Sequence, residues 1–457
     1  MRFFITYFLL LIGCYTSYAQ NLLGEALASY SVIDVNSGRV IAEKNGDMAL
    51  VPASVTKVIT TATVLDVIPA QKRFETLIEY NGKISNGTLY GKLIIKGCGD
   101  PTLGSSYINS SKERVFNEIV SILKRNGIYS VCGEVVCDNS LFPYNGARGA
   151  WLCEDLGNYY AAESYGVNFI DNLYSLYFNT GNEGGNATIT KCEPLMPELT
   201  FINRLKVKGN GKDSAYITGM DFCDTRLLNG TIPCNKSNYK LKGAIPSPSA
   251  VFERELRNFL ITNGMWVESS NDIAINKTNN TLGVIYSPQL KDIVTITNHR
   301  SNNLYAETLL KWCGLVRGGE ATSDKGIGVV MNLWQERGVD MSNCLLFDGS
   351  GLSPKNKISS NCIANILCKA YENVAFKNSL PKVGIDGTVK NFMKDMPSAK
   401  HLSLKTGSMQ GVQCYAGYYD NGSDIYAIVI MVNNFNGKRK DVQIEIGRLI
   451  ENIITNN

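Results

Sequence analysis

The chain has 457 residues, of which 44% are hydrophobic and 19% are charged. This composition is typical of a globular protein with apolar material for two or three domains, and it excludes a disordered chain. The formal net charge is only +4, and the longest basic run is the KRK of residues 438–440. We therefore expect no nucleic-acid partner and no binding to an anionic membrane surface.

The first 19 residues have the pattern of a secretory signal peptide. Arg2 precedes an apolar stretch over residues 3–13, and Ser17-Tyr18-Ala19 forms a small-x-small cleavage site. The apolar stretch is shorter than the roughly 20 residues that a membrane span needs. We expect export to the periplasm or cell envelope, and processing at Cys14 instead would give a lipoprotein.

The cysteines and histidines bear on disulfides and metals. Removing Cys14 from the 13 cysteines leaves 12, and in an oxidising compartment these could pair, although the sequence does not say how. Cys132 and Cys137 would face opposite sides of a strand. His299 and His401 are the only histidines, a thin supply of nitrogen ligands for zinc. We expect neither a metal nor a cofactor.

The predicted elements begin with a hairpin over residues 28–45, which turns at Asn36-Ser37-Gly38. Ser54 then opens an apolar helical segment that Pro69 ends. Residues 73–245 carry short alternating runs separated by Asn-Gly, Gly-Asn and Asp-Pro turns, which indicates a β-rich module.

Helix and strand patterns resume after this module. Ser247-Pro248 predicts a helix start, and the helix should end at Asn263-Gly264. Asn421-Gly422 predicts a second hairpin, followed by an amphipathic helix over residues 441–455. Because the two hairpins can share one antiparallel sheet, we predict a discontinuous α/β (α+β) domain over residues 20–72 and 246–457, with residues 73–245 as a β-rich insertion.

One candidate nucleophile lies at the start of the first helix. If the segment is helical, Lys57 lies one turn after Ser54 on the same face, close enough to take the hydroxyl proton. Apolar residues around the lysine favour burial, which lowers the pKa of an amine. Taken alone, S-x-x-K also fits a capping serine with an exposed lysine.

Two later stretches favour the catalytic interpretation. Ser301-Asn302-Asn303 precedes a helical pattern, and Lys405-Thr406-Gly407 lies in a predicted strand. The order S-x-x-K, S-x-N, K-T-G resembles the active-site motifs of penicillin-binding proteins and serine β-lactamases. The segments GCGDPTLGS (97–105) and FDGSGLSPKNKIS (347–359) are similar to the penicillin-binding protein 4 type, the class C D-alanyl-D-alanine carboxypeptidases and endopeptidases.

This resemblance covers nearly the whole mature chain and implies a penicillin-binding, β-lactamase-like transpeptidase domain, with helices flanking its antiparallel sheet. It implies a serine D,D-peptidase that removes the terminal D-alanine of peptidoglycan stem peptides, can also cleave cross-links, and is acylated by β-lactams. Ser54 would be the nucleophile and Lys57 its base. Ser301 would relay a proton to the leaving amine, Asn303 would hold Lys57 and the substrate amide, and Lys405 would favour a neutral Lys57.

The resemblance also implies substrate-binding residues. The substrate carboxylate would lie near the strand residues Thr406, Gly407 and Ser408. The diamino acid side chain of the stem peptide would lie near three further residues, Gln410, Asp155 and Tyr160. Asp155 and Tyr160 could instead be an ordinary surface acid and a core aromatic residue.

Two positions depart from the family pattern. Pro354 stands where some relatives carry an arginine after G-L-S, which leaves the anchoring of the diamino acid's carboxylate open. Cys98 interrupts what is often a glycine run, and we have no account of it. The sequence does not indicate the oligomeric state or the balance between the two cleavages.

Three other functions compete with the peptidase. A β-lactamase commonly carries E-x-x-x-N after S-x-N, but here the pattern occurs at Glu113 and Glu154, both before Ser301. A Ser-His-Asp hydrolase would use His299, which on a strand would face the same side as Ser301. A silent cell-wall scaffold would have lost part of the catalytic set, which is complete here.

Overall fold

The computed structural model describes residues 26–108, 110–143, 150–209, 213–220, 223–267 and 278–456. The predicted signal peptide and Cys14 lie outside these residues. Within the described residues, no helix combines the length and apolar character needed to cross a membrane. The chain forms two compact units. The first comprises Met1–Asp66, Val294–Ser301 and Val329–Asn457, and the second comprises Val67–Ile293 and Asn302–Gly328.

The first unit is built on an antiparallel five-stranded sheet with the order β18-β19-β20-β1-β2. Its strands are β1 (Leu27–Asp34), β2 (Val40–Lys44), β18 (Leu402–Met409), β19 (Val412–Asp420) and β20 (Ile425–Asn433). Each of the two predicted hairpins is present, and strands β1 and β20 join them. The prediction that they share one sheet is confirmed.

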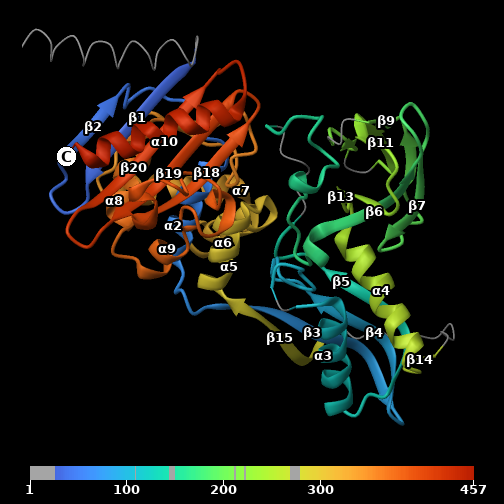
Figure 1. Ribbon diagram of the computed structural model, residues 1–457. Coiled ribbons are helices and arrows are strands. Elements are labelled where there is room, and N and C mark those ends of the chain that lie inside the picture. Colours follow the sequence, from blue (N-terminus) through green and yellow to red (C-terminus); the bar gives the residue numbers. More distant parts are fainter. Residues whose placement is uncertain are drawn as a thin grey trace, which may run out of the picture. The chain divides into compact units, whose positions relative to one another are not determined.

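Both faces of this sheet are covered by helices, as Figure 1 shows for α10 (Arg439–Thr455). Ile446 and Ile450 of α10 are buried in one core with Ile428 and Ile430 of β20. Strand residues alternate between faces, so Val429 points to the opposite face. Helix α8 (Ser360–Ala370) also packs on β1 and β20. Near-complete burial of β20 follows from this double cover.

The first unit also contains the helix that starts near Ser54. The α-helix α2 (Thr56–Val67) follows the single 3-10 turn η1 (Ala53–Val55), and its first ten residues are all buried. Thr63 accepts a hydrogen bond of 2.8 Å from Trp334 Nε1. The other elements that lie wholly or partly in the unit are α5 (Leu290–Arg300), α7 (Ser323–Glu336), β16 (Cys344–Leu345), β17 (Lys357–Ile358), α9 (Val374–Asn378), η4 (Gly387–Val389) and η5 (Pro397–His401).

The second unit contains a mixed five-stranded sheet and several smaller ones. The larger sheet has the order β14-β5-β4-β3-β15 and is formed by β3 (Arg73–Ser85), β4 (Thr88–Lys96), β5 (Ser130–Asp138), β14 (Trp266–Val267) and β15 (Asn280–Gln289). The smaller sheets are formed by β6 (Leu173–Thr180), β7 (Ala187–Glu193), β8 (Thr200–Asn203), β9 (Lys206–Lys208), β10 (Tyr216–Thr218), β11 (Thr225–Asn229), β12 (Thr231–Pro233) and β13 (Tyr239–Ala244).

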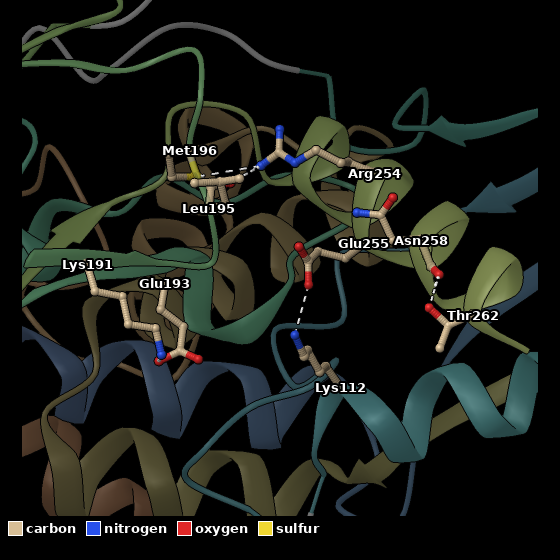
Figure 2. A network of polar contacts seen from close by, with 9 residues as sticks. All are labelled: Lys112, Lys191, Glu193, Leu195, Met196, Arg254, Glu255, Asn258 and Thr262. Carbon is tan, nitrogen blue, oxygen red and sulfur yellow. Dashed lines mark hydrogen bonds and ion pairs between the residues drawn. The ribbon is translucent and has the colours of Figure 1, made fainter.

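Helices complete the second unit. They are α3 (Lys112–Arg125), α4 (Pro248–Thr262), α6 (Asn303–Gly318) and the 3-10 turns η2 (Tyr159–Ala161) and η3 (Ile170–Asn172). Phe116 of α3 and Phe252 of α4 pack edge to face in the core. Figure 2 shows polar contacts around the same helices: Lys112 pairs with Glu255 at 2.8 Å, and Arg254 donates to the Leu195 carbonyl.

The predicted insertion, residues 73–245, lies within the second unit, which continues to Ile293. The continuation has a physical cause, because β15 pairs with β3 and α4 packs on β5. Helix α4 starts at Pro248 as predicted. Helix α3 was not predicted, although Ser111 caps it by accepting a hydrogen bond from Arg114 N. The domain boundaries drawn from the sequence stay a prediction.

Candidate active site

Ser54 lies in a turn that the rest of the first unit holds in place. The side chain of Asn433, at the end of β20, accepts a hydrogen bond from Val51 N at 2.8 Å and donates one to Val51 O at 3.1 Å. Ala53 has a φ of 47°, a left-handed conformation that is unfavourable for a non-glycine residue. The serine next to it is partly exposed, whereas both its neighbours are buried. The turn therefore presents the Ser54 hydroxyl at the surface of the unit.

Lys57 lies one turn further on and is fully buried. Its Nζ is 3.0 Å from Ser54 Oγ, as the helical spacing predicted. The same Nζ donates a hydrogen bond of 2.5 Å to the carbonyl oxygen of Ser350. Because these contacts hold the amine on two sides, it stays within proton-transfer distance of the hydroxyl.

A second hydroxyl–amine pair lies in the same unit. Lys405 Nζ donates to Ser301 Oγ at 2.9 Å and to the Thr406 carbonyl at 2.6 Å. Burial, and after it the charge of Lys57, hold the pKa of Lys405 well below its usual range. Since the repulsion is mutual, a proton on either amine disfavours a proton on the other.

Strand β18 brings its K-T-G residues against the Ser54 turn. A Cβ added to Gly407 would lie 2.3 Å from Pro52 O and 3.2 Å from Ser54 N. The strand is at the edge of its sheet, so alternate N–H groups point away from β19. Thr406 Oγ1 donates to Thr388, Ser408 Oγ donates to Gln413, and Gln410 is exposed in the turn after the strand.

The remaining predicted residues form a cluster within the second unit. Asn303, the first residue of α6, donates its Nδ2 to the Tyr160 carbonyl at 2.7 Å. The Tyr160 hydroxyl donates to Asp155 Oδ1 at 2.8 Å. Burial raises the pKa of Asp155, while the hydrogen bond from Tyr160 partly offsets that shift. The structure thus pairs Asp155 with Tyr160, while their predicted role in binding the diamino acid stays a prediction.

A model of the D-Ala-D-Ala carboxypeptidase 3 (S13) family matches residues 16–453. The chain belongs to this family. It is 24% identical over 418 residues to the D-alanyl-D-alanine carboxypeptidase DacB of Haemophilus influenzae, covering 88% of this chain and 84% of that protein. It is also 24% identical over 435 residues to the D-alanyl-D-alanine carboxypeptidase of Actinomadura sp. strain R39, covering 90% and 78%.

Solved structures agree on the fold. The crystal structure of penicillin binding protein 4 from Haemophilus influenzae superposes with a TM-score of 0.79, covering 96% of this chain and 98% of that one at 23% identity. The family and fold inferred from the three motifs are therefore confirmed. So is the enzyme class, a serine D-Ala-D-Ala carboxypeptidase.

The alternative of a Ser-His-Asp hydrolase, in which His299 shares a strand face with Ser301, is corrected by the structure of this D-Ala-D-Ala carboxypeptidase. His299 lies on helix α5 and not on a strand, so alternation does not align it with Ser301. Its Nδ1 is 3.8 Å from Asp386 Oδ1, and burial lowers its pKa. Sequence reasoning also missed the contact of Ser350 with Lys57, because a backbone carbonyl leaves no mark in the residue type. The sequence marks the segment that carries Ser350 only by its resemblance to the family.

Gly407→Ala should slow acylation of this carboxypeptidase by a β-lactam about 100-fold, because the new Cβ displaces the backbone around Ser54 by a large fraction of an ångström. The rate is measured by intact-protein mass spectrometry on folded protein. Gly328→Ala is the control, since nothing lies within 4 Å of its added Cβ. An unchanged rate in Gly407→Ala would show that the strand does not constrain the turn.

Lys405→Met should flatten the dependence of stability on pH. The unfolded chain binds a proton at Lys405 below its ordinary pKa, while the folded chain, whose Lys405 pKa is lowered, resists it. Wild-type stability therefore falls relative to the variant as the pH drops from about 10 toward neutrality. Urea unfolding midpoints at several pH values test this, with exposed Lys400→Met as control. Parallel wild-type and Lys405→Met curves would contradict it.

Proposed function

We propose that this chain cleaves the terminal D-alanine from peptidoglycan stem peptides through an acyl-enzyme on Ser54. The observation that carries the proposal is the 3.0 Å contact between Ser54 Oγ and the buried amine of Lys57. Lys57 takes the hydroxyl proton as Ser54 attacks the carbonyl of the penultimate D-alanine. The C–N bond breaks, the terminal D-alanine leaves with a proton on its amine, and water then hydrolyses the ester.

The second pair suits the departure of the leaving group. Ser301 Oγ, which accepts from Lys405, could pass a proton to the leaving amine. The N–H groups of Ser54 and Ser408 are the proposed oxyanion hole, in which each donor contributes about 3 kcal/mol to transition-state stabilisation. The closeness of Gly407 to Ser54 N supports this assignment, since it brings the edge of β18 to the start of the nucleophile's turn.

Asp155, Tyr160 and Asn303 are the proposed contacts for the rest of the stem peptide. Asp155 would pair with the ammonium group of the diamino acid, and Tyr160 would pack on its aliphatic part. Their mutual hydrogen bond fixes the carboxylate for that purpose. Asn303 would bind the substrate amide, and its bond to the Tyr160 carbonyl links these residues within the unit. The exposed Gln410 is assigned to the same subsite, and Thr406 and Ser408 to the substrate carboxylate.

β-Lactams are the proposed covalent inhibitors. Penicillin binding protein 4 of Haemophilus influenzae has been solved in complex with a β-lactam, and an endopeptidase of Bdellovibrio bacteriovorus has been solved acylated by penicillin G. A β-lactam presents a strained amide to the same nucleophile and leaves no separate amine to depart. Cleavage of cross-links that end at the same D-alanine is a further proposed activity.

Membership of a cell-wall peptidase family implies export. We assign the mature protein to the periplasm or cell envelope, because peptidoglycan lies there. Release at Ala19 and lipidation at Cys14 predict different masses for the mature chain, so intact mass separates them.

The first test follows a labelled penicillin adduct and D-alanine release from a stem peptide. Wild type should form one stable adduct and release D-alanine, and Ser54→Ala should do neither. Lys57→Ala should acylate at least about 100-fold more slowly, because it loses its general base.

Each outcome of this test has a defined meaning. An adduct retained in Ser54→Ala would refute the proposed nucleophile. An adduct that decays within seconds would favour a β-lactamase, and no adduct on folded wild type would favour a silent scaffold.

Asp155→Asn should raise KM for a stem peptide with a free diamino acid amine by about 10-fold or more, the value of a charged hydrogen bond. The rate of acylation by penicillin, a molecule without that amine, should be unchanged. Because burial raises the pKa of Asp155, wild-type affinity should fall at a less acidic pH than an ordinary aspartate would give.

A stem peptide with its amine acetylated is the matched control. Its KM should be the same for wild type and Asp155→Asn. Equal KM values for the free-amine peptide in both proteins would remove Asp155 from the subsite.

A further inference from the structure

The loop that follows β16 is organised around one buried carboxylate. Asp348 has no exposed surface. Its Oδ1 accepts hydrogen bonds from Gly351 N at 2.7 Å and from Asn356 Nδ2 at 2.8 Å, and its Oδ2 accepts one from Ser353 N at 2.7 Å. Three short bonds to one carboxylate restrict the backbone between them, since moving any donor would leave a buried charge undersatisfied.

The two carbonyl groups enclosed by these contacts both face helix α2. Thr60 Oγ1 donates to Gly349 O at 2.7 Å, and Lys57 Nζ donates to Ser350 O at 2.5 Å. The loop is therefore held from one side by Asp348 and touches the catalytic helix on the other.

Gly351 shows how closely the loop approaches the nucleophile's turn. Its φ is 78°, and an added Cβ would lie 1.9 Å from Ala53 O. Only glycine fits this conformation and this gap. Because nothing can intervene, a shift of the loop is transmitted directly to the residues around Ser54.

We propose that Asp348 is a positioning residue for the acylation step: its carboxylate fixes the Ser350 carbonyl, and that carbonyl holds the Lys57 amine at Ser54. The inference rests on the proposed function, in which Lys57 is the base. A lysine side chain has four rotatable bonds, so its amine needs an external acceptor to stay in one place. A neutral amine that donates one N–H to Ser350 can direct its lone pair to the Ser54 hydroxyl.

The test variant is Asp348→Asn, which keeps the shape of the side chain. Both oxygens of the carboxylate accept hydrogen bonds from N–H groups, so the amide nitrogen of the asparagine would face at least one of these donors. Two N–H groups cannot bond to each other, and the loop therefore has to shift. We expect the first-order acylation constant with a labelled penicillin to fall about 10- to 100-fold per active site, while the dissociation constant of the preceding non-covalent complex changes less than about 2-fold. Active sites are counted by the final adduct stoichiometry.

This split separates positioning from simple damage to the fold. A purely structural role would reduce the fraction of protein that titrates, but the remaining molecules would acylate at the wild-type rate. Asp340→Asn is the matched control, because Asp340 also accepts a backbone N–H, from Ser342, in an exposed turn. If Asp348→Asn does not fold, Asn356→Ala removes one donor to the same carboxylate and should give a smaller fall in the same constant.

A double variant decides whether Asp348 acts through Lys57. In a Lys57→Ala background, Asp348→Asn should slow acylation much less than it does in wild type, because the amine it positions is gone and only the contact of the loop with the Ser54 turn remains. A full additional loss would overturn the inference, as would a wild-type rate in Asp348→Asn alone. Both outcomes are distinct from failure of the proposed function, which is judged by Ser54→Ala and Lys57→Ala.

Discussion

The site depends on keeping two amines, those of Lys57 and Lys405, buried and close together in one unit. Both side chains are fully buried, and the charge of Lys57 contributes to the lowered pKa of Lys405. Burial of an ammonium is costly, and two close cations repel. Repulsion between the two amines therefore disfavours a state in which both are protonated. A neutral amine next to a serine hydroxyl is what acyl transfer by this route requires.

The surrounding fold places a serine hydroxyl and a backbone carbonyl against each amine. The hydroxyl belongs to Ser54 or Ser301, and the carbonyl to Ser350 or Thr406. The hydroxyl of Ser54 comes from the same helical turn as its amine, whereas Ser301 reaches its partner across 104 residues of sequence. Pairing of β18 with β19 fixes the Lys405 end of this contact, and Ser301 directly follows helix α5 at the other end. Helix α2 and strand β18 thus carry the two lysines that are proposed for the chemistry.

The sequence predicted the parts of this arrangement that local patterns determine. Asn421-Gly422 predicted the hairpin of β19 and β20, and the spacing of Ser54 and Lys57 predicted their contact. Alternation failed for His299, because a short polar segment before Ser301 does not reveal that it ends a helix. The contacts of Asp348 were out of reach for another reason. The Asp348 carboxylate accepts from N–H groups of its own loop, and the Lys57 amine donates to the Ser350 carbonyl. Residue types do not indicate which backbone groups lie close together.

Asp348 is proposed to act on Lys57 through the Ser350 carbonyl, and this indirect arrangement has a chemical advantage. A carboxylate in direct contact with Lys57 would favour the ammonium form and remove the base. In the structure the Asp348 carboxylate accepts hydrogen bonds from the N–H groups of Gly351, Ser353 and Asn356, and the group of this loop that accepts from the amine is the uncharged carbonyl of Ser350. A carbonyl has a strong dipole and no net charge, so it orients the amine and favours its protonation less than an anion would. The loop can thus hold the Lys57 amine, the proposed base, through an uncharged group.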